Sequence, residues 1–329
     1  MQPFVIPEGP TPFHCVEQMR MAIAAAGLPL QITQLAGGRL QSDLQILPLG
    51  TLRLLRVRLD RPVHVRGTKN PALQLVCLSL APSSRLPSLR SHGHLLAPTA
   101  FCGLAAEGEV HITLPAGASV GLLMIEREVF RRSCLELGCE ALAADRFAGN
   151  CLTIDGRRFE GVRRVLLAAL ASRPVGASAQ LVADDLMPLL LEALIHATQG
   201  AHTLLRPPAR IAVVMEAQRW MEHHPGQPLS LSDLCQRVHV SRRSLIQGFR
   251  DHLGMGPIAF LRLQRLHAVR QELLLADPQR ATVFDVASRY GFHNHGHFAA
   301  AYRHLFGEPP AATLRLASGQ GGISQPTPR

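Results

Sequence analysis

The stretch LSLSDLCQRVHVSRRSLIQGFRDHLG, residues 229–254, decides the fold of the C-terminal part of the chain. Ser232 is placed to cap one short helix, and Ser241 is placed to cap a second. Leu245 and Phe249 lie at i and i+4 of the second helix and therefore share one face. A helix, a tight turn at 239–240 and a second helix at this spacing predict a helix-turn-helix.

The stretch TVFDVASRYGFHNHGHFAAAYRHLFGEPP, residues 282–310, repeats this pattern. Ala287 takes the place of Cys235 at an offset of 52 residues, and Phe298 and Tyr302 repeat the first core pair at an offset of 53. The difference indicates one residue inserted in the second turn, where Gly291 stands. The sequence therefore predicts two helix-turn-helix units in tandem.

The residues between the two units, 256–278, predict a stiff connecting helix. Apolar side chains recur there at helical spacing, and we expect them to form one buried stripe: Ile258, Leu261, Leu266, Val269 and Leu273. A spacer of this kind would hold the two units at a fixed separation.

The first half of the chain has the period of strands. Short apolar or alternating runs, separated by Pro, Gly and Ser, occupy residues 55–59, 72–80, 109–114 and 119–125. Several short strands at such spacing predict a sandwich or small barrel.

Helical spacing follows in 127–138, 161–172 and 179–200, the last with Pro188 inside it. Its apolar face requires a packed helix, either in the same chain or in a second copy. Pro207 and Pro208 indicate a stiff linker.

Charge is distributed unevenly along the 329 residues. The net charge is +10, and residues from 206 onward have 15 arginines against 8 acidic residues, a net of +7. A polyanion is the expected partner of this part.

No apolar run is long enough to span a membrane and no signal peptide is evident, so we expect a cytoplasmic protein. Seven cysteines without a CxxC motif favour reduced thiols over a disulfide framework or a zinc module.

Residues 210–315 resemble the DNA-binding module of the AraC/XylS transcription regulators. The resemblance rests on Gly291-Phe292, Phe298, Tyr302 and Gly307-Glu308-Pro309-Pro310, beside the repeated units. It implies an α+β chain with a cupin-like, ligand-sensing β-rich domain at 1–175 and a dimerisation helix and linker at 176–208. It further implies an all-α double helix-turn-helix domain at 209–316 and a disordered tail at 317–329.

A narrower resemblance is to the ethanolamine-utilisation operon regulators. It rests on the double arginine 242–243, on Gly296 and on the alanines 299–301. This resemblance implies ethanolamine or a related metabolite as the effector.

In the family's module, the second helix of each unit enters the major groove of DNA. The residues that we expect at the interface are Ser241, Arg242, Arg243, Ser244, Gln247, Asn294, His295 and His297. Arg243 is our first choice to read a base, because arginine can donate two parallel hydrogen bonds to guanine. Gln247 is the second, and Arg242 and Ser244 are expected to hold phosphates. The alternative is that the arginine pair is solvated surface charge.

The second unit departs from the family pattern, because Ala300 stands where a phosphate-holding arginine is common. Asn294 is expected to cap the helix or to touch phosphate, and His295 to reach a base. His297 is either a contact residue or plain surface. The two recognition helices should lie about 34 Å apart, one turn of DNA.

Several histidines and cysteines of the sequence offer a metal site or an enzyme as the alternative interpretation. His293, His295 and His297 lack an acidic or thiol partner in the sequence. His92 and His94 form the HxH pattern of metal-binding cupin enzymes, but no glutamate follows. Cys134 and Cys139, on a predicted helix, are either a redox pair or two buried thiols. We expect no catalytic residue, metal or cofactor.

The sequence thus predicts a DNA-binding transcription regulator, expected to be an activator, that responds to a small-molecule effector. Its expected partners are double-stranded DNA, the effector, RNA polymerase and a second copy of the chain, with no membrane. The alternative is a cupin-type metalloenzyme with an accessory DNA-binding domain.

Overall fold

The computed structural model describes residues 9–81, 89–105, 108–144, 150–198 and 209–318. The chain divides into two compact units, one made of residues 1–34 and 40–207 and the other of residues 35–39 and 208–329. The expected linker prolines, 207–208, and the chain beyond residue 318 lie outside the described residues.

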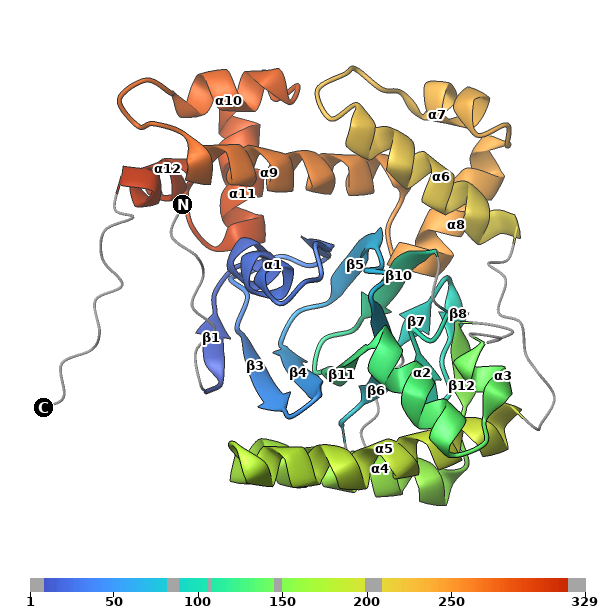
Figure 1. Ribbon diagram of the computed structural model, residues 1–329. Coiled ribbons are helices and arrows are strands. Elements are labelled where there is room, and N and C mark those ends of the chain that lie inside the picture. Colours follow the sequence, from blue (N-terminus) through green and yellow to red (C-terminus); the bar gives the residue numbers. More distant parts are fainter. Residues whose placement is uncertain (1–8, 82–88, 106–107, 145–149, 199–208, 319–329) are drawn as a thin grey trace, which may run out of the picture. The chain divides into compact units, whose positions relative to one another are not determined.

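The N-terminal unit contains two antiparallel sheets (Figure 1). The seven-stranded sheet has the order β1 (Thr11–Phe13), β3 (Ser42–Leu49), β4 (Leu52–Leu59), β11 (Ser119–Glu126), β6 (Leu73–Ser79), β9 (Ala100–Cys102), β12 (Cys151–Thr153). The five-stranded sheet has the order β2 (Gln31–Gln34), β5 (Val63–Thr68), β10 (Glu109–Leu114), β7 (Arg90–Ser91), β8 (His94–Leu95). The four predicted strands are confirmed as β4, β6, β10 and β11.

Alternating side chains explain why the seven-stranded sheet has two buried faces. Along β11, Val120 and Met124 belong to a core shared with the five-stranded sheet and with helix α1 (Val16–Ala25). Leu123 and Ile125 of the same strand belong to a second core on the other face. Successive side chains of a strand point to opposite faces, so one apolar strand serves both cores.

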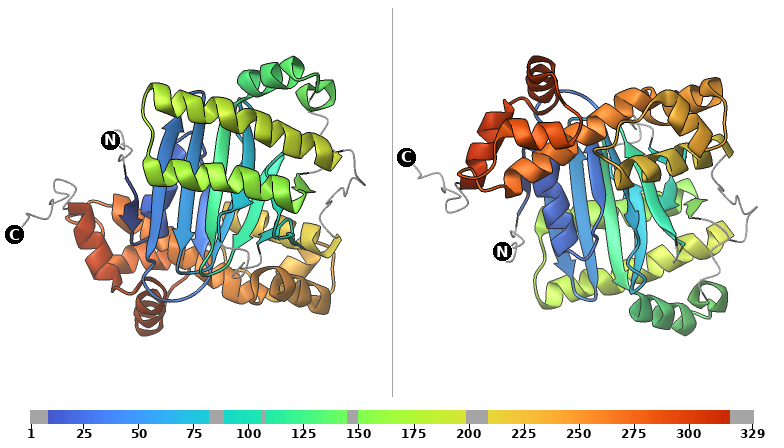
Figure 2. Two further views of the ribbon diagram at one scale, coloured as in Figure 1. Left: turned by 90° about the horizontal axis from the view of Figure 1, so that it is seen from below. Right: turned by 90° about the horizontal axis from the view of Figure 1, so that it is seen from above.

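Helices cover the second face of the large sheet. They are α2 (Arg127–Glu136), α3 (Glu140–Ala143), α4 (Gly156–Ser172) and α5 (Ala177–Thr198), and α4 and α5 run side by side across the strands (Figure 2). Leu186, Leu190 and Leu194 of α5 are fully buried in this core. The apolar face that required a partner is therefore covered by the chain's own sheet.

One detail of this region differs from expectation, and a second agrees with it. Cys139 does not share a helix with Cys134, because α2 ends at Glu136 and Cys139 precedes α3. Pro188 lies within α5 and is exposed. Among the described residues, none of the helices combines the length and the apolar character needed to cross a membrane.

The C-terminal unit consists of α6 (Ala209–His223), α7 (Leu231–Arg237), α8 (Arg242–Leu253), α9 (Pro257–Leu275), α10 (Val283–Arg289), α11 (His295–Phe306) and α12 (Pro310–Ser318). Two cores form in it. Leu245 and Phe249 are buried in the first, and Phe298 and Tyr302 in the second, as predicted.

Helix α9 joins the two cores (Figure 1). Phe260 and Leu261 pack in the first core, and Leu266, Val269 and Leu273 pack in the second. The connecting helix is confirmed. Ile258 was wrongly included in the buried stripe, because its side chain is 44% exposed at the first turn.

The turns and caps follow from local chemistry. Ser241 Oγ accepts from the Ser244 N–H, and Asn294 Oδ1 accepts from the His297 N–H, which confirms both caps. The cap of α7 is Ser230, not Ser232, because Ser230 and Asp233 form a reciprocal capping box. The first turn spans 238–241 and the second 290–294, so the extra residue lies in the second turn.

Candidate nucleic-acid interface

The first recognition helix, α8, presents its N-terminal residues to solvent. Leu245 and Phe249 face the core, so the opposite face of the helix points outward. Ser241, Arg242, Arg243 and Gln247 are exposed, and Ser244 is half-buried. DNA can therefore contact these exposed side chains without any rearrangement of the core.

Arg242 and Arg243 differ in their contacts. The Arg242 guanidinium donates a hydrogen bond to Ser232 Oγ on α7. Among the described residues, Arg243 makes no hydrogen bond or ion pair through its side chain. The two arginines also begin a helix, where positive charge opposes the helix dipole unless an anion lies nearby. Arg242 is thus fixed against the protein, whereas Arg243 keeps its donors for a partner.

Gln247 is oriented by a short polar chain that the sequence did not reveal. Its Nε2 donates to Asp251 Oδ1 at 2.6 Å, one turn further along α8. Arg210 of α6 forms an ion pair with the other oxygen of Asp251 at 3.2 Å. One of the two N–H groups of the Gln247 amide is therefore used within α8, and the side chain remains exposed. Glutamine at such a position can recognise adenine.

The second recognition helix, α11, exposes Asn294, His295 and His297. Asn294 uses its side-chain oxygen for the cap, which is one of the two roles expected for it. The His295 ring lies against Phe284 of α10, with ring centroids 4.4 Å apart. Phe284 is 54% exposed, and sequence reasoning missed it because an aromatic residue in a helix is usually part of the core.

Four further arginines of the C-terminal unit lie on the helices α8, α9 and α11. Arg250 and Arg303 are exposed near the C-terminal ends of α8 and α11. Arg262 donates to the His297 carbonyl at 3.4 Å, and Arg265 donates to the Gln227 carbonyl. Burial lowers the pKa of Arg265 from its usual value. Arg262 and Arg265 therefore also have structural partners within the protein.

A capping carboxylate supports the first unit. Hydrogen bonds from the backbone and side chain of Ser230 lower the pKa of Asp233 below its usual value. Asp233 is therefore charged at neutral pH, in the first turn of α7, where a negative charge is favourable. This arrangement fixes the start of the helix that carries Ser232, the partner of Arg242.

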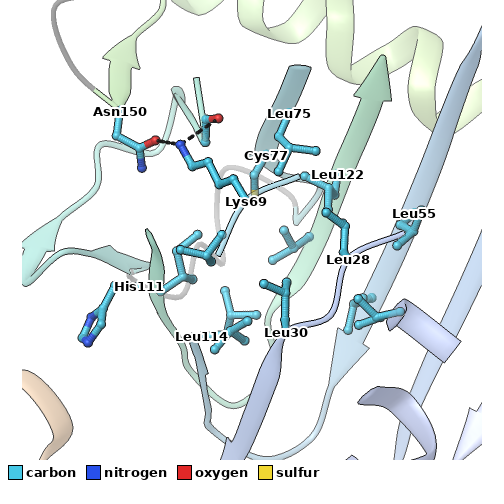
Figure 3. Close-up of a pocket in the computed structure, with 17 residues that line it drawn as sticks. Leu28, Leu30, Leu55, Lys69, Leu75, Cys77, His111, Leu114, Leu122 and Asn150 are labelled. Atoms are coloured by element: carbon cyan, nitrogen blue, oxygen red, sulfur yellow. Dashed lines mark hydrogen bonds between the residues drawn. The ribbon is translucent and has the colours of Figure 1, made fainter. Parts of the chain in front are cut away.

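The N-terminal unit contains a cavity of about 100 Å³ between its two sheets (Figure 3). Leucine side chains from several strands surround it, among them Leu55, Leu114 and Leu122. Lys69, which is the only lysine of the sequence, lies with Asn150 at one end. The cavity is thus apolar with one polar end.

The polar end is built by hydrogen bonds. Lys69 Nζ donates to Asn150 Oδ1 at 2.6 Å, to the Ala105 carbonyl at 2.5 Å and to the Gly103 carbonyl at 3.3 Å. Its side chain is buried, and oxygen acceptors offset the cost of burying an ammonium group. Neither this lysine nor the cavity was predicted, because the contributing strands are far apart in sequence.

His92 and His94 lie beside this region on β7–β8. The His92 ring contacts Ser91 Oγ and the Glu109 carbonyl, each at 3.0 Å. Burial lowers the pKa of His92. Within the described residues, neither His92 nor His94 belongs to a group of three or more potential metal ligands.

Comparison with known proteins bears on the C-terminal unit. Residues 234–316 match the model of a helix-turn-helix domain. A probable thc operon regulatory protein of Rhodococcus erythropolis is 37% identical over 148 residues, which make up 45% of this chain and 43% of that protein. The XylDLEGF operon transcriptional activator 2 of Pseudomonas putida is 35% identical over 98 residues, 30% of this chain and 62% of that protein.

A solved structure gives a similar match. A probable AraC family transcriptional regulator from Rhodopseudomonas palustris CGA009 is 32% identical, with a TM-score of 0.31, and the match covers 32% of this chain and 97% of that chain. The present chain spans less than two thirds of the two curated relatives. Together, the helix-turn-helix match and the two curated relatives support a DNA-binding transcription regulator and disfavour an enzyme.

Proposed function

We propose that this chain is a sequence-specific DNA-binding transcription regulator whose activity is set by a small apolar effector. The observation that supports DNA reading most directly is the pair of solvent-facing recognition helices, α8 and α11, each fixed on its own core. The net charge of +7 from residue 206 onward supplies the attraction to phosphates.

In this proposal Arg243 reads a guanine in the major groove and Gln247 reads the neighbouring base. A bidentate arginine–guanine pair contributes about 1–3 kcal/mol of discrimination. Arg242 and Ser244 hold the phosphate backbone, with Ser232 aligning the Arg242 guanidinium. In the second unit, the exposed His295–Phe284 pair meets the DNA, and His297 lies at the margin of the contact.

The experiment is selection of binding sites from random duplex DNA, followed by affinity measurements on the selected site. Arg243→Ala should relax the preference at one base position, at a cost of about 1–3 kcal/mol. Arg242→Ala should weaken binding to all DNA sequences alike and reduce the slope of log K against log salt by about 1. The matched control is Arg132→Ala, which removes an exposed helical arginine of the N-terminal unit.

Wild-type affinity and an unchanged base profile in both Arg242→Ala and Arg243→Ala would leave the arginines as surface charge. If the wild-type chain selected no sequence from the random pool, the proposal of sequence-specific binding would be wrong.

The effector site that we propose is the cavity between the two sheets. An apolar lining favours an apolar ligand, and at the Lys69–Asn150 end one oxygen acceptor of a ligand can replace the Gly103 carbonyl, which accepts from Lys69 Nζ at 3.3 Å. Ethanolamine, implied by the narrower resemblance, fits less well, because its ammonium group would be buried beside Leu55 and near the Lys69 charge.

Thermal shift and calorimetry of the full chain test this site. Benzyl alcohol should raise the melting temperature more than toluene, and Lys69→Met should reduce that difference. Ethanolamine should produce no shift. A shift with ethanolamine that survives Lys69→Met would place the effector elsewhere, whereas no shift with any apolar probe would remove the cavity from the proposal.

The proposal also covers the oligomeric state of the chain and its effect on transcription. We propose a homodimer and activation through RNA polymerase, supported by the activator named among the relatives. The residues left exposed on and beside α5, Leu181 at 64% and Val175 at 78%, are the candidates for the dimer contact. Sedimentation of wild type and Leu181→Glu tests this, and a monomeric wild type would contradict it.

A further inference from the structure

Three cysteines lie in a row across adjacent strands of the seven-stranded sheet. Cys77 of β6 is directly opposite Cys102 of β9, and Cys102 is directly opposite Cys151 of β12. Their side chains are 7%, 1% and 5% exposed. The strand register therefore places Cys102 between Cys77 and Cys151. All seven cysteines are among the described residues, and none forms a disulfide.

The pairing of β9 with β12 places the Cys102 and Cys151 side chains close together. The Ile154 N–H donates to the Thr99 carbonyl, which makes residues 99 and 154 a hydrogen-bonded pair of the ladder. Since such pairs alternate with non-hydrogen-bonded pairs, Cys102 and Cys151 form a non-hydrogen-bonded pair. In these pairs the Cα atoms are about 4.5 Å apart, which lies within the range that a disulfide spans.

Cys77 gives the row a connection to the cavity. Its side chain lines the cavity together with Lys69 and Leu122 (Figure 3). A small molecule in the cavity therefore meets Cys77 before the two deeper thiols. At the other end of the row, the Ser91 hydroxyl hydrogen-bonds Cys151.

We propose that Cys77, Cys102 and Cys151 form an oxidation site in which a hydroperoxide entering the cavity reacts at Cys77 and the product is a Cys102–Cys151 disulfide. This proposal goes beyond DNA binding and does not depend on it. Disulfides inside cells are usually transient or redox-sensing, which is the use expected for such a site.

The chemistry balances in three steps. The Cys77 thiolate attacks the hydroperoxide, its sulfur becomes a sulfenic acid, and an alcohol or water leaves. Cys102 attacks this sulfur, giving a Cys77–Cys102 disulfide and water. Cys151 then attacks the Cys102 sulfur by thiol–disulfide exchange, which forms Cys102–Cys151 and returns Cys77 to the thiol. In sum, two thiols and one hydroperoxide give one disulfide, one alcohol or water, and one water.

The surroundings of Cys102 and Cys151 favour the protonated thiols, so in the second and third steps each thiol passes its proton to the leaving group, which is the sulfenic hydroxyl in one step and the Cys77 sulfur in the other. The hydrogen bond to Cys102 and burial raise the pKa of Cys151. At Cys102, the bond with Cys151 lowers the pKa, but the bond with Cys77 and burial outweigh it, so its pKa is also raised. Direct oxidation of these two thiols is therefore disfavoured, because the thiolate is the nucleophile.

The Cys102–Cys151 disulfide would link β12, the last strand of the seven-stranded sheet, covalently to β9. Among the described strands, β12 pairs with β9 alone, and it leads through Asp155 into α4. A covalent bond between the two strands would tie the start of α4 to the sheet, which is a local change that an oxidant could impose on the N-terminal unit.

Peptide mapping by mass spectrometry tests the proposal on the native full chain treated with hydrogen peroxide or cumene hydroperoxide. The expected result is a Cys102–Cys151 cross-link that dithiothreitol removes. Cys77→Ala should slow its formation at least tenfold, and Cys134→Ala, which changes a buried thiol outside the row, should leave the rate unchanged.

Two results would overturn the proposal. One is oxidation confined to Cys15, Cys139 and Cys235, which are partly exposed, with the row unmodified. The other is an unchanged cross-linking rate in a Cys77→Ala variant with a wild-type circular dichroism spectrum, which would remove the entry role of Cys77. If that variant fails to fold, the order in which wild-type cross-links appear decides, since Cys77–Cys102 must precede Cys102–Cys151. The readout is independent of DNA affinity.

Discussion

Glu308 connects the last helix-turn-helix elements through a buried polar network, and its removal gives a sharp prediction. Its Oε1 forms an ion pair with Arg270 of α9 at 2.9 Å and accepts a hydrogen bond from Thr313 Oγ1 at 2.7 Å. The Tyr302 hydroxyl donates to Thr313 Oγ1 at 2.9 Å, and the Arg270 guanidinium lies over the Phe306 ring. Arg270 and Thr313 thus share one carboxylate oxygen, and Tyr302 joins the network through Thr313.

The structure gives the size of two effects. Glu308→Ala leaves the Arg270 guanidinium, whose side chain is 5% exposed, without this anion. Breaking a buried pair in this way costs about 3–5 kcal/mol, and we expect the lower end, about 3, because the Glu308 side chain is 27% exposed. Tyr302→Phe removes one hydrogen bond, while Thr313 keeps its bond to Glu308, so its cost should be about 1 kcal/mol.

Hydrogen exchange on the full chain, followed in peptides of α11, measures these costs locally. At about 1.4 kcal/mol per tenfold change, Glu308→Ala should speed amide exchange roughly a hundredfold and Tyr302→Phe roughly fivefold. Peptides of α4 serve as the internal control and should not change. Equal effects of the two variants, or no effect of Glu308→Ala, would refute the view that the carboxylate stabilises the second unit.

Two further predictions concern close packing and pH. Gly248→Ala should lower the free energy of unfolding in denaturant by about 1–3 kcal/mol, because an added Cβ would lie 2.9 Å from Val214 Cγ2. The control Gly161→Ala, where nothing lies within 4 Å of an added Cβ, should raise the free energy of unfolding by about 0.5–1 kcal/mol. A change of the same sign in both variants would count against this explanation. His92 has a lowered pKa through burial, so the unfolded chain takes up its proton first, near pH 6.5. The stability of the N-terminal unit should therefore fall as pH drops through 6.5 and level off below the folded pKa. His92→Asn, which tolerates the left-handed backbone (φ 49°), should flatten that part of the thermal-melting curve, and an unchanged curve would contradict the assignment.

The sequence by itself determined the elements that local chemistry controls. The offset between Leu245–Phe249 and Phe298–Tyr302 was sufficient to predict two equivalent cores, because a side chain's place on a helix depends only on spacing. The caps at Ser241 and Asn294 followed from their short polar side chains. The α7 cap was misplaced by two residues, since Ser230 and Ser232 offer the same hydroxyl and only the reciprocal partner, Asp233, distinguishes them.

The tertiary structure alone decided what depends on strand order and on contacts between distant segments. Cys77, Cys102 and Cys151 are separated by 25 and 49 residues, and the register of three strands makes them neighbours. The partner of Arg242, Ser232, lies on another helix and is supplied by packing of the same kind, whereas Gln247 finds Asp251 one turn further along its own helix. Periodicity states which face of an element is buried, but not which other face it meets, because many pairings bury the same apolar area. The cavity end at Lys69 belongs to this second class, and so does the difference between the two neighbouring arginines.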